Sequence, residues 1–183
     1  MMVRGEVKYM TNGKNDATDA LKQSRKDAGK TQLQLSLEMG YSREAISQQE
    51  NGRASVSPDV SRHMSAQYND PRVGIESAHE YKSWGLGWLD GEALDQHRAA
   101  VVMRTKKELK EALESIDEVA IAKQPKHIEE FERQQIEDAL VESAEAIAFL
   151  EFEIAKLCQD YNFKFNDIFS SAEQRLRAER LVK

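Results

Sequence analysis

A run of polar side chains occupies one short predicted helix in the N-terminal half of the chain. Its members are Ser42, Arg43, Glu44, Ser47 and Gln48. Arginine and glutamine can form paired hydrogen bonds with the edges of purine bases, and serine and glutamate can add single bonds. Because these side chains share the outward face of the helix, the sequence predicts a surface able to read bases in the major groove of double-stranded DNA.

The segment that positions these side chains is Thr31–Arg53, which we predict to form two short helices joined by a glycine turn. Gly40 lies where the chain must reverse, a position that favours a residue without Cβ. Thr31 and Ser42 can cap the two helices with their hydroxyl groups. The inward apolar residues are Leu35 and Met39 on the first helix and Ala45 and Ile46 on the second.

This segment resembles the lambdoid phage repressor and Cro family, the XRE-type helix-turn-helix regulators, without a gap from Arg25 to Arg53. The glutamine and glycine typical of that family fall on Gln32 and Gly40, and its Glu-Asn-Gly ending begins at Glu50. The resemblance implies a partly buried ion pair between Arg25 and Glu50. After Pro58, the apolar residues Val60, Met64 and Tyr68 recur every four positions, as expected of a fourth helix, so the resemblance covers about residues 16–75.

The family resemblance implies an all-α fold whose N-terminal part is a five-helix, lambda-repressor-like DNA-binding domain. The DNA-binding residues that it implies, together with the polar face, are Gln32, Ser42, Arg43, Glu44, Ser47, Gln48, Asn51 and Arg53. Two residues depart from the pattern, because Gln49 occupies a position that is usually apolar and Ser36 one that is usually alanine. A buried polar group without a partner costs about 1–3 kcal/mol, so we expect either residue to loosen the small core.

Charge is distributed unevenly along the chain. Residues 1–75 carry 11 Lys and Arg against 9 Asp and Glu, whereas residues 76–183 carry 15 against 23. Non-specific affinity for nucleic acid comes mainly from neutralising phosphates, so a protein with a net charge of −6 is not a general nucleic-acid coat. The positive groups near the motif are Lys22, Lys26, Lys30, Arg43, Arg53 and Arg62.

Composition and the three prolines divide the chain into four parts. We predict a flexible N-terminal arm over 1–15, the DNA-binding domain over 16–80, a connector over 81–93 and a helical assembly domain over 94–183. The connector contains Trp84, Trp88 and three glycines, and we favour a packed link between domains over an effector pocket.

The assembly domain is predicted to be a helical hairpin or bundle. A helical pattern runs from Leu94 to Val119 and resumes after Pro125. The residues of the second run that follow the 3–4 spacing of a coiled-coil seam are Ile136, Leu140, Ser143, Ile147, Leu150, Ile154, Leu157 and Tyr161. Three residues off this seam, Phe131, Phe149 and Phe152, need a second surface. That surface is either a partner subunit or a final helix at Ser171–Val182.

Catalytic and metal-binding patterns are weak in this sequence. The carboxylate pairs Glu142/Glu145 and Glu114/Asp117 share helix faces, as a magnesium-dependent helical pyrophosphohydrolase requires, but charged pairs are common on solvated faces. The four histidines are too scattered for a zinc site, and the lone Cys158 fits a buried apolar position. We therefore expect no enzymatic activity, no bound metal and no cofactor.

The sequence as a whole predicts a sequence-specific transcriptional regulator similar to phage or prophage repressors, binding a palindromic operator in double-stranded DNA as a homodimer. The alternative is an antitoxin or adaptor that regulates its own gene and binds a protein partner, such as a toxin or antirepressor, through its acidic helices. No apolar stretch is long enough to cross a bilayer and no secretory signal is evident, so we expect a cytoplasmic protein.

Overall fold

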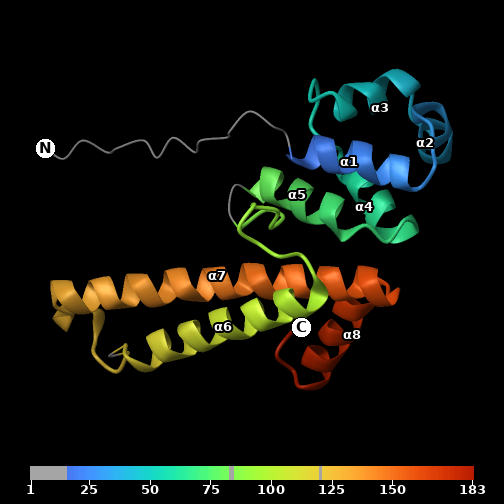
Figure 1. Cartoon of the computed structure of the whole chain (residues 1–183). Coiled ribbons are helices and arrows are strands. Elements are labelled where there is room, and N and C mark those ends of the chain that lie inside the picture. The colour runs from blue at the N-terminus through green and yellow to red at the C-terminus, as the bar shows by residue number, and fades with distance from the viewer. Residues whose placement is uncertain (1–15, 83–84, 120) are drawn as a thin grey trace, which may run out of the picture.

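The computed structural model describes residues 16–82, 85–119 and 121–183. These residues form eight α-helices, one short 3-10 helix and no strand, which confirms the all-α prediction. The helices are α1 (Asp16–Asp27), α2 (Gln32–Met39), α3 (Arg43–Glu50), α4 (Pro58–Gln67), α5 (Pro71–Lys82), α6 (Arg98–Asp117), η1 (Pro125–His127), α7 (Glu130–Tyr161) and α8 (Phe165–Ala178) (Figure 1). The predicted arm, residues 1–15, lies outside the described residues.

Helices α1 to α5 surround one small apolar core. Its buried residues come from all five helices and the α3–α4 loop: Ala17, Ala20, Leu21, Leu35, Ile46, Val56, Val60, Met64 and Val73. Local signals set the helix starts, because Thr31 forms a capping box with Gln34, and Ser57 accepts the Val60 N–H just before Pro58. The prediction that the segment after Pro58 closes the core is confirmed, since Val60 and Met64 are fully buried and Tyr68 packs against them.

The two residues that depart from the family pattern are buried, and both have hydrogen-bond partners. Ser36 donates its hydroxyl to the Leu33 carbonyl at 2.8 Å. Gln49 accepts the backbone N–H of Ser57 at 2.7 Å, which ties α3 to the start of α4. The expectation that they loosen the core is therefore wrong, because neither side chain is left without a partner.

A polar contact that the sequence did not predict braces α2 against α4. The Glu38 carboxylate accepts hydrogen bonds from Lys30, at 2.6 Å, and from the Tyr68 hydroxyl. These two bonds hold the pKa of Glu38 below its usual value. Burial, followed by the bond to Glu38, raises the pKa of Tyr68 to about 12.

The raised pKa of Tyr68 predicts a loss of stability in alkaline solution. The unfolded chain releases this proton near pH 10, whereas the folded chain keeps it to about pH 12, so the contribution is complete below pH 10 and is lost as the pH rises through that window. We expect Tyr68→Phe to flatten the fall in unfolding free energy between pH 9.5 and pH 11.5, as measured by urea unfolding. The exposed Tyr161 supplies a control, and an equal effect of Tyr161→Phe would contradict the assignment.

The connector packs against both halves of the chain through Trp88. Its indole ring meets the buried Phe152 ring of α7 edge-on, with centroids 4.8 Å apart, and its backbone N–H donates to Glu76 of α5 at 2.9 Å. A Cβ at Gly87 would lie 2.9 Å from the Glu76 carboxylate, so a larger residue there would displace this side chain. Trp84, the other tryptophan of the predicted connector, lies outside the described residues.

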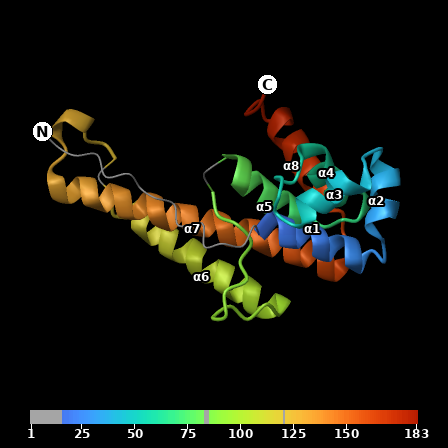
Figure 2. The ribbon, with the colours of Figure 1, turned by 90° about the horizontal axis from the view of Figure 1, so that it is seen from above.

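Helices α6 and α7 form an antiparallel hairpin whose turn points away from the N-terminal domain (Figures 1 and 2). The predicted seam is only partly covered. Ile136, Ser143, Ile154 and Leu157 are half-buried, whereas Leu140 and Ile147 are each 65% exposed and Tyr161 is 58% exposed. Ala139 and Ala146, one position earlier in the sequence, are buried instead. Small side chains let the two helices approach closely, and the large seam residues are displaced to one side.

The final helix starts earlier than predicted, at Phe165 rather than Ser171, and ends at Ala178. Asn69 accounts for the early start, because its side chain accepts the Phe165 N–H at 3.0 Å and donates to the Phe163 carbonyl at 2.7 Å. The off-seam phenylalanines do not behave alike: Phe152 is buried against Trp88, whereas Phe131 is 60% exposed. Among the described residues, no helix has the length and apolar character needed to cross a membrane.

Candidate nucleic-acid interface

Helix α3 is held in place by a sharp turn before it and a buried side chain within it. Gly40 ends α2 in the left-handed conformation, with φ 67°, and turns the chain toward α3. Ser42 caps α3 by accepting the Ala45 N–H at 3.0 Å. Ile46 is fully buried, which fixes the side of α3 that faces the core and leaves the opposite side exposed.

The C-terminal end of α3 is anchored by a buried polar network. The Glu50 carboxylate accepts two bonds from Arg25, at 2.5 Å from Nε and 3.0 Å from Nη2. It also accepts a bond from the Gln32 side-chain amide at 2.9 Å. Glu50 is 2% exposed, so this network joins α1, α2 and α3 inside the domain. The ion pair implied by the family resemblance is thus present in the structure.

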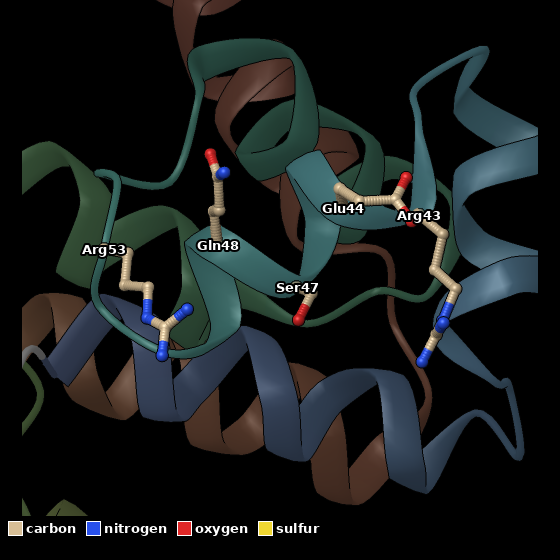
Figure 3. A pocket seen from close by; sticks show the side chains of 5 residues that line it. All are labelled: Arg43, Glu44, Ser47, Gln48 and Arg53. Atoms are coloured by element: carbon tan, nitrogen blue, oxygen red, sulfur yellow. The ribbon is translucent and has the colours of Figure 1, made fainter.

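Five of the eight predicted DNA-binding residues line one shallow hollow on the outer side of α3 (Figure 3): Arg43, Glu44, Ser47, Gln48 and Arg53. The two arginines lie at opposite ends of the hollow, and Ser47 and Gln48 lie between them (Figure 3). Arg43, Glu44, Gln48 and Arg53 are exposed. The hollow therefore offers donors and acceptors along the length of one short helix, which is the arrangement that reading base edges requires.

The other three predicted residues have structural contacts of their own. Gln32 bonds to Glu50, and Ser42 caps α3. Asn51 follows the last turn of α3 and donates its side-chain amide to the Ser47 carbonyl at 2.7 Å. Each keeps the motif helices in place, and each has hydrogen-bonding capacity left, since an amide has two donors and a hydroxyl can donate while it accepts.

The predicted positive groups divide into paired and unpaired side chains. Lys30 lies 2.6 Å from Glu38 and Arg62 lies 3.0 Å from Asp59, so both are partly neutralised within the domain. Arg43 and Arg53 have no ion-pair partner among the described residues, and both lie at the hollow. Lys22 and Lys26 on α1 likewise have no ion-pair partner in the part of the chain that the structure describes, so the unneutralised charge of the motif lies both at the hollow and on α1.

A carboxylate cluster lies far from this surface, between α6 and α7. Oxygen atoms of Glu108, Glu142 and Glu145 lie within 4.8 Å of one another, so the pair Glu142/Glu145 does meet a third carboxylate. Arg104 Nε lies 2.5 Å from the buried Glu108 carboxylate, and Lys107 Nζ lies 3.8 Å from it. These cations offset the negative charge of the cluster, and we assign no site there. Cys158 is buried, and burial raises the pKa of its thiol, which disfavours the reactive thiolate.

Comparison with known proteins identifies the domain that carries the hollow. Residues 21–69 match the family model for helix-turn-helix domains, a segment that begins within α1 and ends just after α4. No match was found among curated proteins or among solved structures. The matched segment contains both motif helices and the residues of the hollow, so residues 21–69 are similar to helix-turn-helix domains.

Proposed function

We propose that the chain is a sequence-specific transcriptional regulator, a repressor of the phage or prophage type that binds a palindromic operator as a homodimer. The observation that carries this proposal is the hollow on α3, where five polar or charged side chains gather and two arginines lack an acidic partner. XRE-type helix-turn-helix domains bind DNA, and this hollow lies on the outer side of the second motif helix.

In the proposed complex, α3 lies in the major groove, and Arg43, Glu44, Ser47 and Gln48 contact base edges. Arg53 lies just beyond the helix and reaches the phosphate backbone. Gln32 keeps one amide hydrogen free beside its bond to Glu50, and that hydrogen can bind a phosphate oxygen. Two subunits related by a two-fold axis would place their α3 helices in successive major grooves, about 34 Å apart.

We propose that the three parts of the chain have different roles, in line with the contacts between them. Residues 16–80 bind DNA, residues 81–93 join the domains through Trp88, and residues 94–183 assemble the dimer. In Figure 1, α3 lies on the side of the N-terminal domain that is farthest from the α6–α7 hairpin. The acidic second half therefore lies away from the bound DNA, and its charge limits non-specific binding to phosphates. A regulator of this kind acts in the cytoplasm, where it meets the chromosome.

Selection of genomic fragments by the full chain tests this proposal. Purified protein is mixed with sheared DNA at about 150 mM salt, which screens weak phosphate contacts, and the retained fragments are sequenced. We expect enrichment of a palindrome whose half-sites lie about one helical turn apart. Retention without any preferred sequence would contradict the proposal. A folded protein that retains no DNA fragment would also contradict it. The adaptor alternative would then be tested by a search for a protein partner.

A further inference from the structure

The contact between α6 and α7 uses small and polar side chains. The residues of this contact that are buried are Val101, Thr105, Glu108 and Ala112 on α6 and Ala139 and Ala146 on α7. The Thr105 hydroxyl lies 3.3 Å from the Phe149 carbonyl of the opposite helix, which shows how closely the backbones approach. Large apolar side chains do not fit along this line, so the hairpin leaves them outside.

The displaced side chains form a row along the hairpin. Their exposed fractions are 62% for Leu113, 41% for Ile116, 65% for Leu140, 65% for Ile147 and 37% for Leu150. On α7 the spacing of these residues is 7 and 3, which is that of a coiled-coil seam and suits packing against another helix. The row is unusual for a surface in contact with water, since monomers rarely expose a large contiguous apolar patch.

Helix geometry places this row on one side of the hairpin and the carboxylates on the other. Successive residues of an α-helix are about 100° apart, so Leu113 on α6 and Leu140 and Ile147 on α7 turn toward the same side of the antiparallel pair. Glu108 and Glu142 meet on the opposite side. We call the first side the apolar face. It continues toward the hairpin turn as a groove lined by Pro125, Ile128, Arg133, Ile136, Glu137 and Leu140.

The size and charge of the apolar face fit a second copy of the chain. Two helices packed side by side, each about 10 Å wide and about 30 Å long, present roughly 600 Å², close to the roughly 800 Å² that each partner buries in a specific complex. The edges of the face carry both signs of charge, with Lys106, Lys110 and Asp117 on α6 and Arg133 and Glu137 on α7. Because both signs are present, two such faces can meet without repulsion between like charges dominating the contact.

We infer that the apolar face of the α6–α7 hairpin binds the same face of a second chain, so that two hairpins form a four-helix bundle. This inference rests on the proposed function in one respect, because binding to a palindromic operator requires two subunits related by a two-fold axis. Burial of the exposed leucine and isoleucine side chains drives the association. Figure 2 shows that the end of the hairpin extends beyond the N-terminal domain, where a second hairpin can approach.

The mass of the full chain in solution, measured by light scattering at micromolar concentration without DNA, tests this inference. We expect twice the 20.8 kDa of one chain for the unmodified protein and 20.8 kDa for the double variant Leu140→Glu/Ile147→Glu. Both side chains are exposed, so the variant should keep its helical circular dichroism. Val141→Glu is the matched control, because Val141 is the next residue, is 52% exposed and points about 100° away from the apolar face.

A monomeric unmodified chain would overturn the inference, and so would a Leu140→Glu/Ile147→Glu variant that stays dimeric. Dissociation of Val141→Glu to the same extent would also overturn it, because loss of the dimer would then not depend on a charge placed on the apolar face. The measurement is independent of the proposed function, since Arg43→Ala should weaken operator binding and keep the dimer mass. A dimer that binds no preferred DNA sequence would contradict the proposed function alone.

Discussion

Replacing Glu50 by alanine is expected to destabilise the N-terminal domain by about 3–5 kcal/mol, because the change leaves the charge of Arg25 buried without its partner. Glu50 is 2% exposed and accepts three hydrogen bonds from Arg25 and Gln32. A small domain is stable by only about 5–15 kcal/mol, so this loss is a large share of the total. Urea unfolding of the full chain, followed by circular dichroism, measures the effect, and hydrogen exchange of the α1 to α3 amides locates it.

The control for this prediction is Glu44→Ala, which removes an exposed carboxylate from the same helix and should change stability little. A double variant, Arg25→Met/Glu50→Met, should lose less stability than Glu50→Met alone, because it removes both charges. Equal unfolding midpoints for Glu50→Ala and Glu44→Ala would show that the network does not stabilise the domain.

Arg43→Ala and Gln48→Ala are each expected to weaken binding to the selected operator by about 1–3 kcal/mol, or roughly 5- to 150-fold in Kd. Both side chains line the hollow and are exposed, so their removal should leave the domain folded. Binding to random DNA should change little for Gln48→Ala, which carries no charge, and only modestly for Arg43→Ala. Titration of labelled operator and random duplexes at one salt concentration gives both values.

Arg175→Ala is a suitable control for these two variants, because Arg175 is an exposed cation on α8, outside the N-terminal domain. It should leave the affinities for both duplexes unchanged. If Arg43→Ala and Gln48→Ala reduced binding to operator and random DNA equally, the two side chains would contact the backbone rather than base edges.

The helix-turn-helix segment could be predicted from sequence because its signals are local or belong to a known pattern. Thr31, Gly40 and Ser42 each act within a few residues, as caps or as a turn. Leu35 and Met39 are four residues apart and share one face of α2, so their packing in the core follows from the pattern. The ion pair between Arg25 and Glu50 spans 25 positions and was available only through the family resemblance.

The remaining features depend on contacts that no spacing encodes. Tyr68 and Glu38 are 30 positions apart, and nothing in either segment pairs them. On α7, the alanine line through Ala139 and Ala146 and the seam through Leu140 and Ile147 have the same period of seven. Periodicity therefore cannot tell which of these two sets of residues is buried. The close approach of α6 buries the alanines and leaves Leu140 and Ile147 exposed.

The measurement that tests base reading by α3 most directly is methylation interference on the selected operator. Dimethyl sulfate methylates guanine at N7 in the major groove and adenine at N3 in the minor groove, so it distinguishes the two grooves. We expect interference at guanine N7 positions in two related half-sites about one turn apart, and loss of part of this pattern with Arg43→Ala. Interference at adenine N3 alone, or at no base, would contradict the account.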